Sequence, residues 1–303
     1  MTGHSTPHEA KPRIAKTMGK ARIFSEALPF IKDFRGSTVV IKYGGSAMVD
    51  ESLRNTFADD VAMLHYVGIH PVIVHGGGPH ISRAMGQRGI EPQWFEGLRV
   101  TDEETIRVVQ STLAGEINPD IVRLINAHGS VAAGVNGLDG NLFVAKPRDE
   151  RLGFVGEITQ VNPGLIQSLQ HQGYVPVVAP LARGEDGKAY NLNADTAAGA
   201  LAEALGALKV IYLTDVEGLY RDLGDKDSLI ARITVPGLED LVASGSASSG
   251  MLPKLQSCMS AVRGGVERAH ILDGRMQHAL LLEIFTPEGI GTMVTMEPVP
   301  LAL

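Results

Sequence analysis

The sequence contains little of what disulfide-linked, zinc-binding or membrane-spanning proteins need. Among its 303 residues the only cysteine is Cys258, which excludes an intramolecular disulfide and a cysteine-based zinc site. No uninterrupted apolar run approaches the length that crosses a bilayer, and residues 1–13 lack the apolar core of a secretory signal. We therefore expect a cytoplasmic protein without a membrane partner, in which Cys258 is a small core residue.

An excess of positive charge is also missing. The 27 lysines and arginines are outnumbered by 34 aspartates and glutamates, so the formal net charge is -7. This balance argues against a dedicated nucleic-acid binder. The hydrophobic content of 44% and the charged content of 20% are those of an ordinary soluble globular protein, and the length suffices for two lobes or one large α/β domain.

Two glycine-rich loops are the most informative stretches of the chain. Residues 37–46, STVVIKYGGS, and residues 71–79, PVIVHGGGP, each join a short apolar run to consecutive glycines and then to a helical pattern. Such runs are typical of buried strands in a parallel sheet. Glycines at a strand's exit let backbone N–H groups approach an anion, and the following helix adds its positive end. Because Lys42 interrupts the first strand just before the glycines, the pair of loops predicts a phosphate-binding surface.

Strand and helix patterns alternate along most of the chain. Apolar runs predict strands at residues 72–74, 130–135, 174–179, 209–213 and 270–272, a hairpin from 142–147 and 153–160, and an edge strand within 286–295. Helical spacing predicts a helix over 102–128, which Pro119 should kink or divide, and one over 14–34, which Pro29 should kink or split. The expected fold is a three-layer α/β/α sandwich with a mostly parallel central sheet and a kinked N-terminal helix.

The best-known motifs of nucleotide-dependent phosphotransferases are absent. The P-loop GxxxxGK[ST], the protein-kinase glycine loop and the HRD triplet do not occur. Phosphoryl transfer nevertheless requires mainly glycine loops for phosphate, cations on the transferring group and a hold on the acceptor. The chain offers IKYGG, HGGG, GLRVT, NLNAD, TDVEGLY and GMLPK, in this order.

These motifs, with EGIGTM near the C-terminus, make the chain resemble the amino acid kinase superfamily over about residues 37–296. Within it, they resemble the branch that uses ATP and Mg²⁺ to phosphorylate the γ-carboxylate of N-acetyl-L-glutamate in arginine biosynthesis. The resemblance implies an N-terminal lobe over 37–205 that binds the acceptor and contacts other subunits. A C-terminal lobe over 206–303 would bind the nucleotide, and residues 1–36 would form an N-terminal arm.

The resemblance also implies roles for single residues. Lys42 and Lys254 would stabilise charge on the transferring phosphoryl group, and Asp195 would orient both lysines. The acceptor would be bound by Gly77, Gly78, Arg99 and Asn191, and the nucleotide by Gly44, Gly45, Asp215, Gly218, Tyr220 and Ser249. No metal site is assigned to protein side chains.

The chemistry agrees with these roles. A γ-carboxylate with a reference pKa near ~4.3 is ionised at neutral pH, so no general base is required, and none stands out among the motifs. The obstacle is repulsion between the carboxylate and the γ-phosphoryl group. Two lysines, backbone N–H groups and Mg²⁺ address that repulsion.

Each singled-out side chain also has a plainer interpretation. Lys254 could be a solvated helix lysine, and Asp195 could simply favour the start of a helix. Arg99, beside Trp94 and Phe95, could be a stacked structural arginine. His75, in the HGGG loop, is expected to be structural.

Members of the family that arginine inhibits resemble this chain in their extra N-terminal helix and their EGIGTM segment. The resemblance implies feedback inhibition by L-arginine and a hexamer built as a trimer of dimers. The effector contacts would be Lys209, Glu283, Glu288 and Gly289. Some relatives bind a PII signalling protein, and nothing in this sequence decides that point.

Two other functions stay open at this point. A related kinase acts on N-acetyl-aminoadipate, which is one methylene longer, and a pocket distinguishes one methylene only weakly. A catalytically dead nucleotide or arginine sensor is the rival from a different class. The joint presence of Lys42, Asp195 and Lys254 argues against it, since a sensor does not need the lysine pair.

Overall fold

The centre of the molecule is an eight-stranded sheet made from short apolar runs. The structure, a computed structural model, describes residues 23–222, 224–244, 251–287 and 289–298. Over these residues the sheet has the order β12-β14-β13-β11-β1-β2-β8-β5; β13 and β14 pair antiparallel, and the other neighbours pair in parallel. Its strands are β1 (Thr38–Tyr43), β2 (His70–His75), β5 (Ala132–Asn136), β8 (Val175–Ala179), β11 (Lys209–Thr214), β12 (Arg232–Thr234), β13 (Arg268–Asp273) and β14 (Thr292–Thr295).

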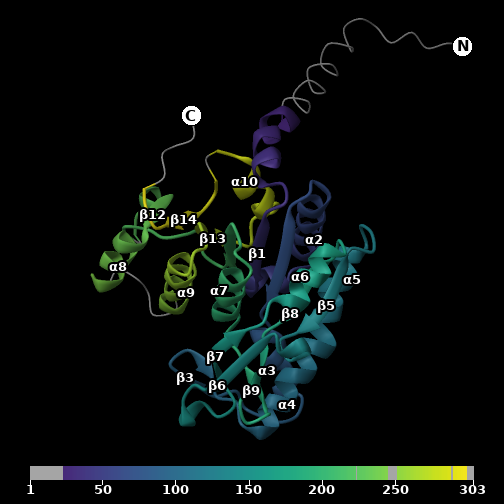
Figure 1. The fold of residues 1–303 in the computed structure, drawn as a ribbon. Coiled ribbons are helices and arrows are strands. Elements are labelled where there is room, and N and C mark those ends of the chain that lie inside the picture. The colour runs from purple at the N-terminus through teal and green to yellow at the C-terminus, as the bar shows by residue number, and fades with distance from the viewer. Residues whose placement is uncertain (1–22, 223, 245–250, 288, 299–303) are drawn as a thin grey trace, which may run out of the picture.

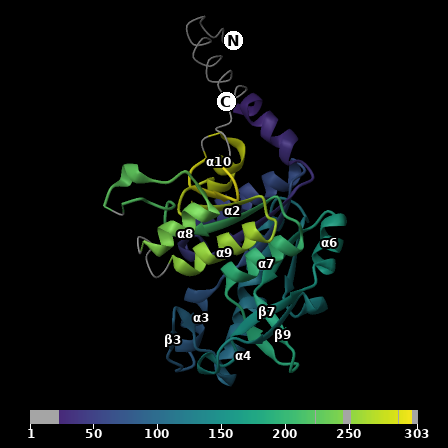
Figure 2. The ribbon, with the colours of Figure 1, turned by 60° about the vertical axis from the view of Figure 1, so that its left-hand side comes forward.

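Helices cover both faces of this sheet, which confirms the predicted three-layer α/β/α sandwich (Figure 1). One layer contains α7, α8 and α9, which lie next to one another in Figure 2, and the other contains α2, α4 and α5. The helices are α2 (Glu51–Tyr66), α3 (Gly78–Gly86), α4 (Glu103–Thr112), α5 (Asn118–Asn126), α6 (Gly164–His171), α7 (Ala194–Ala204), α8 (Val235–Ala243), α9 (Leu252–Arg263) and α10 (Ala279–Phe285). Within the described residues, no helix is both long and apolar enough to cross a membrane.

A smaller sheet and a hairpin lie at the lower end of the molecule in Figure 1. The predicted hairpin is present as β6 (Phe143–Pro147) and β7 (Gly156–Val161), and it continues into β9 (Leu181–Gly184) and β10 (Ala189–Asn191). The QWFEGLRVT segment forms a separate hairpin of β3 (Trp94–Phe95) and β4 (Leu98–Arg99). Single-turn 3₁₀ helices occur at Gly45–Met48, Asp139–Asn141, Glu150–Leu152 and Lys226–Ser228.

The expectation of an edge strand within residues 286–295 is wrong. The strand β14 lies between β13 and β12, and the edge of the sheet is β12. The sequence pattern missed β12 because it has only three residues, each of them partly exposed. Short strands of this kind depend on their neighbours rather than on local propensity.

The predicted helix over residues 102–128 is divided as Pro119 requires. Between α4 and α5 the backbone forms a π-helical turn from Leu113 to Ile117, and Pro119 follows at the start of α5. Proline lacks an N–H group, and the first turn of a helix tolerates that loss. Single π-turns inside helices often lie at functional sites.

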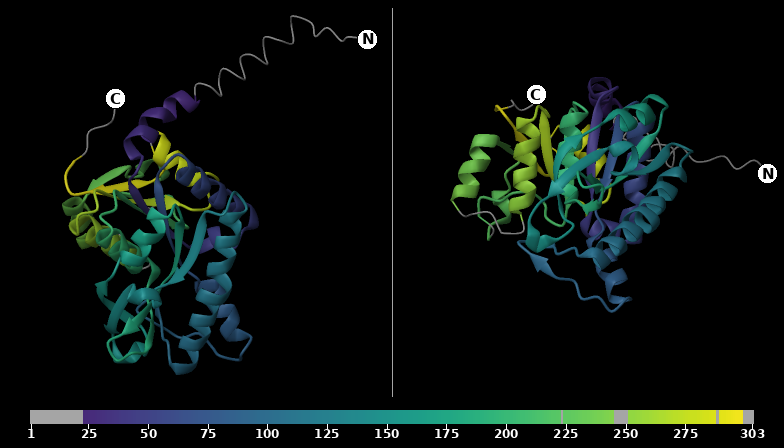
Figure 3. Two further views of the ribbon diagram at one scale, coloured as in Figure 1. Left: turned by 45° about the vertical axis from the view of Figure 1, so that its right-hand side comes forward. Right: turned by 60° about the horizontal axis from the view of Figure 1, so that its bottom comes forward.

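The N-terminal helix projects from the body next to α10, as Figure 3 shows. Residues 23–34 are helical, and Pro29 does not split them. Residues 14–22 of the predicted helix lie outside the described residues. The helix packs on the body through Phe30 and Phe34, whereas Ile23, Phe24 and Leu28 are exposed.

Candidate active site

The two predicted phosphate-binding loops lie together where parallel strands end. The strands β1 and β2 are adjacent in the sheet, and each is followed directly by its glycine loop. The parallel strands β11 and β13 end at the same side of the sheet, at Thr214 and Asp273. In open α/β sheets, ligands bind in the crevice outside the carboxyl ends of the strands.

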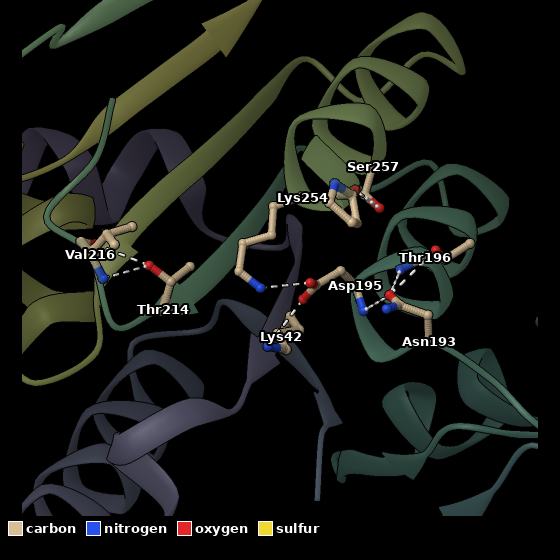
Figure 4. A network of polar contacts seen from close by, with 9 residues as sticks. Lys42, Asn193, Asp195, Thr196, Thr214, Val216, Lys254 and Ser257 are labelled. Atoms are coloured by element: carbon tan, nitrogen blue, oxygen red, sulfur yellow. Dashed lines mark hydrogen bonds and ion pairs between the residues drawn. The ribbon is translucent and has the colours of Figure 1, made fainter. Parts of the chain in front are cut away.

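Lys42, Asp195 and Lys254 form a charged cluster at this edge (Figure 4). Lys42 lies near the end of β1, Asp195 in the first turn of α7 and Lys254 in the first turn of α9. The Nζ atom of Lys42 is 3.0 Å from Oδ1 of Asp195, and Lys254 donates a hydrogen bond of 2.8 Å to Oδ2. The fold therefore brings together three residues that lie far apart in the sequence.

The carboxylate of Asp195 is the centre of this cluster. Burial alone would raise the pKa of Asp195, but the two lysines outweigh burial and hold the pKa below its usual value. Asn193 caps α7 by accepting hydrogen bonds from the backbone N–H groups of Asp195 and Thr196, which fixes where the helix begins. One carboxylate shared by two lysines leaves the cluster with an excess positive charge.

The first glycine loop is crowded by charged side chains. A Cβ atom at Gly44 would lie 2.6 Å from Nζ of Lys42, and one at Gly45 would lie 2.7 Å from Oδ1 of Asp215. Gly45 also has a φ of +70°, which favours glycine. Asp215 accepts a hydrogen bond of 2.8 Å from the backbone N–H of Ser46, so the loop after β11 is tied to the loop after β1.

The second glycine loop forms one wall of a cavity of about 170 Å³. The β3–β4 hairpin and the start of α7 complete the cavity, which is lined by all four residues predicted to bind the acceptor, namely Gly77, Gly78, Arg99 and Asn191. Glycine at position 77 leaves room for the π-helical turn, because a Cβ atom there would lie 2.6 Å from Cδ2 of Leu113 and 2.7 Å from Cδ1 of Ile117 and would push these side chains aside.

Arg99 is both a structural residue and a cavity residue. Its guanidinium donates to the carbonyl of Gly78 at 3.1 Å and to the hydroxyl of Ser82 at 2.8 Å, and it lies 4.5 Å from the centre of the Trp94 ring. Burial lowers its pKa below the usual value. The predicted stacking of Arg99 is therefore present on Trp94, whereas the Phe95 ring lies under Arg151 instead. The same contacts hold a cation at the cavity wall.

Three of the residues predicted to bind the nucleotide, Asp215, Gly218 and Tyr220, lie in the loop that follows β11. Asp215 is exposed, Tyr220 is half-buried and donates a hydrogen bond to Glu217, and Gly218 is buried against Thr292. Ser249 lies outside the described residues. The hydrogen bond from Ser46 to Asp215 joins this loop to the first glycine loop.

The predicted effector residues surround a separate cavity of about 160 Å³ between the N-terminal helix and α10. Lys209, Glu283 and Gly289 line it, and Glu288 lies outside the described residues. The Nζ atom of Lys209 is 4.3 Å from the centre of the Phe34 ring. Burial lowers the pKa of Lys209 to about 8.

Glu283 carries the negative charge of this second cavity. Its carboxylate accepts hydrogen bonds from Nδ1 of His270 at 2.6 Å and from the backbone N–H of Ile290 at 2.8 Å. Burial would raise the pKa of Glu283, but these hydrogen bonds hold it below its usual value, while burial lowers the pKa of His270. We therefore describe the pair as an ionised Glu283 that accepts a hydrogen bond from the Nδ1–H of a neutral imidazole.

Sequence reasoning missed residues that position the predicted ones. Asn193 could have been found, because asparagine two residues before Asp195 is a typical start signal of a helix. The contacts of Asn118 had no local signal, because its partners come from β2, β5 and β8. Among the described residues, no group of three or more histidine, cysteine, aspartate or glutamate side chains could hold a metal ion.

Comparison with known proteins assigns the family. The model of the amino acid kinase family matches residues 37–273. The chain belongs to the amino acid kinase family. The matched residues include both glycine loops and the lysine–aspartate cluster, so the family is assigned on the part of the chain that builds the site.

Within this family the chain is similar to acetylglutamate kinases. It is 52% identical over 289 residues to that of Caldanaerobacter subterraneus subsp. tengcongensis, covering 95% of this chain and 97% of the relative. It is 50% identical over 292 residues to that of Methanothermobacter thermautotrophicus, covering 92% of this chain and 100% of the relative.

Solved structures agree on the fold. An N-acetylglutamate synthase from Neisseria gonorrhoeae, complexed with coenzyme A and N-acetyl-glutamate, matches 92% of this chain with a TM-score of 0.81 and 28% identity. This kinase-family chain spans only 64% of that synthase. A carbamate kinase from Giardia lamblia bound to AMP-PNP matches 86% of this chain with a TM-score of 0.63 and 18% identity, which supports the fold alone.

The charge balance of the cluster predicts the effect of Asp195→Asn. Without the carboxylate, Lys42 and Lys254 face each other with no counter-ion, and we expect the free energy of unfolding at pH 7 to fall by about 3–5 kcal/mol. Urea unfolding measures this loss, with the exposed Asp240→Asn on α8 as control. Because the pKa of Asp195 is depressed in the folded state, its contribution is present above the unfolded pKa near ~3.9 and is lost as pH falls below it. Equal stability of the two variants at pH 7 would contradict the assignment.

Proposed function

We propose that the protein transfers the γ-phosphoryl group of ATP to the γ-carboxylate of N-acetyl-L-glutamate, the second step of arginine biosynthesis. The observation that carries the proposal is the Lys42–Asp195–Lys254 cluster beside two glycine loops. The similarity to acetylglutamate kinases of about 50% identity over nearly the whole chain supports the same acceptor. We expect the enzyme in the cytoplasm.

The lysine pair supplies the charge that this reaction needs. Carboxylate and phosphoryl group are both anions, and the barrier arises from bringing them together and from charge on the phosphoryl oxygens during transfer. Two ammonium groups held by one buried carboxylate are already in position before the substrates bind. No proton must be removed from an ionised carboxylate, so the site needs no general base.

The two ends of the crevice suit the two substrates. The cavity at Arg99 and Asn191 would bind the acceptor, because a planar guanidinium pairs well with its α-carboxylate. The loop with Asp215, Gly218 and Tyr220, together with Gly44 and Gly45, would bind the nucleotide. The lobes over residues 37–205 and 206–303 would then each bind one substrate. Mg²⁺ would enter with ATP, bound mainly by the phosphates and water.

The acceptor is tested by trapping the acyl phosphate as a hydroxamate. We expect ATP-dependent product with N-acetyl-L-glutamate and much less with glutamate or N-acetyl-aminoadipate. Lys254→Ala should lower kcat on the order of 10³-fold, because it removes a cation from the transferring group. Lys188→Ala, on the exposed turn between β9 and β10, is the matched control and should change kcat little.

Each alternative has its own outcome in this assay. A preference for N-acetyl-aminoadipate would instead indicate that the protein is the kinase of lysine biosynthesis. If the wild-type chain forms no acyl phosphate with any of the three acids, the result would favour the non-catalytic sensor.

We also propose that L-arginine inhibits the enzyme by binding in the cavity between the N-terminal helix and α10. The carboxylate of Glu283 would pair with the arginine guanidinium, and Lys209 would pair with the arginine carboxylate. Both charges are buried, so each gains from an opposite charge on the ligand. The helix that carries Phe30 and Phe34 closes the cavity and would sense occupancy.

Glu283→Gln tests the arginine site. We expect the arginine concentration for half-inhibition to rise at least about tenfold, because a charged pair becomes a neutral contact. Turnover without arginine should stay near the wild-type value, and the exposed Glu239→Gln on α8 is the control. Inhibition should also weaken as pH rises through about 8, where Lys209 loses its proton. Arginine inhibition of the variant equal to that of the wild type would exclude this site.

The N-terminal helix is our proposed contact between dimers in a hexamer. Its exposed side chains Ile23, Phe24 and Leu28 lie on a helix that projects from the body, and exposed apolar groups of this kind favour association with a second copy. Light scattering should give a trimer of dimers for the full chain and a dimer for a chain lacking residues 1–36. The same number of subunits in the assemblies of both chains would contradict this role. Binding of a PII protein is a separate question for a pull-down experiment.

A further inference from the structure

His75 is a fully buried histidine at the end of β2 that the proposed chemistry does not use. Its exposed fraction is 0%, although it directly precedes the glycines of the second loop. Both ring nitrogens have partners: Nδ1 lies 2.8 Å from the carbonyl oxygen of Gly76, and Nε2 lies 3.2 Å from Nδ2 of Asn118. A buried imidazole with two fixed partners has a defined tautomer.

The surroundings of Asn118 determine that tautomer. Its side-chain nitrogen also lies 2.8 Å from the carbonyl oxygen of Val177 and 3.2 Å from that of Val135. Carbonyl oxygens only accept, so the group facing them must be the NH₂ of the amide, which only donates. The Nε2 atom of His75 is therefore an acceptor, and its proton lies on Nδ1, which donates to Gly76. Burial lowers the pKa of His75 to about 4, so the ring is neutral at physiological pH.

This hydrogen bond fixes the peptide group between Gly76 and Gly77. The C=O and N–H of a trans peptide point in opposite directions, and the described chain has no cis peptide bond. The carbonyl of Gly76 is held by the buried His75 ring, so the N–H of Gly77 points the other way. The three glycines from Gly76 to Gly78 line the acceptor cavity. Among the described residues, no acceptor takes a hydrogen bond from the Gly77 N–H.

The helical segment that carries Asn118 also packs against the second glycine loop. The π-helical turn immediately before Asn118 places Leu113 and Ile117 against the α-carbon of Gly77. The other side of the loop is held by the N–H of Gly76, which donates to the carbonyl oxygen of Tyr43 at 2.7 Å. The orientation of the peptide is thus set from the core.

We propose that His75, held by Asn118, is a positioning residue that turns the Gly77 N–H toward the phosphoryl group during transfer. The inference rests on the proposed function. A backbone donor that is oriented in advance toward developing negative charge lowers the barrier without binding the ground state more tightly. His75 and Asn118 contact no substrate; they act through the peptide between Gly76 and Gly77.

Substitutions at His75 separate positioning from packing. We expect His75→Leu to lower kcat on the order of 10²-fold while both KM values change less than about threefold. His75→Asn places an amide N–H near the position of Nδ1, so it should recover kcat to within about tenfold of the wild type. Thermal unfolding and ADP affinity, measured on each variant, identify a loss of fold.

Two asparagines of α5 provide a matched pair. Asn118→Leu should lower kcat at unchanged KM, because Nε2 of His75 loses the donor that fixes its tautomer. The side chain of Asn126, two turns further on, bonds within the described part of the chain only to the backbone of residues 131 and 132, so Asn126→Leu should reduce stability but not kcat. A kcat within threefold of the wild type for His75→Leu, or equal losses in His75→Asn and His75→Leu, would overturn the proposal. Equal kcat in the two asparagine variants would overturn it too.

Nitrogen NMR of histidine-labelled protein tests the arrangement without turnover. The signals that disappear in His75→Asn belong to His75, and they should report a neutral ring protonated at Nδ1 between pH 5.5 and 8. A ring protonated at Nε2 would contradict the proposal even in an active enzyme. If the wild type does not phosphorylate N-acetyl-L-glutamate, the proposed function fails, and the tautomer still decides whether His75 orients the Gly77 peptide.

Discussion

The structure depends most on the buried carboxylate of Asp195 between two lysines. Burying charges costs free energy unless they are paired closely, and here one carboxylate pairs with two cations from different elements. The pairing therefore constrains the relative positions of β1, α7 and α9. It also leaves a positive excess at the carboxyl end of the central strands, where the proposed reaction would place the transferring phosphoryl group.

The glycine loops determine how closely substrates can approach that charge. Gly44 and Gly45 leave no room for side chains beside Lys42 and Asp215, and Gly77 leaves none beside the π-helical turn. A side chain at any of these positions would displace the charged or apolar groups that build the site. The two loops lie side by side because their strands pair in parallel, so the carboxyl ends of two neighbouring strands would supply both sides of the proposed transfer path.

The sequence predicted what local patterns encode. Apolar runs ending in glycine predicted β1 and β2, and the family resemblance of the motifs pointed to Lys42, Asp195 and Lys254, which the fold brings into contact. The interior position of β14 in the sheet could not be predicted from the sequence, because it depends on pairing with the short strand β12. The contacts of Asn118 could not be predicted either, because a π-helical turn and three distant strands determine them. Contacts between distant segments are a property of the fold, and local spacing does not contain them.

The most direct test of the account compares the binding of a transition-state mimic with that of a product. Calorimetry would give the affinities of ADP alone and of ADP with Mg²⁺, aluminium fluoride and N-acetyl-L-glutamate, for the wild type and Lys42→Gln. If the lysine pair neutralises charge during transfer, the variant should lose about 10²-fold or more in affinity for the mimic and less than about threefold for ADP. Equal losses for both, or no loss for the mimic, would contradict the account.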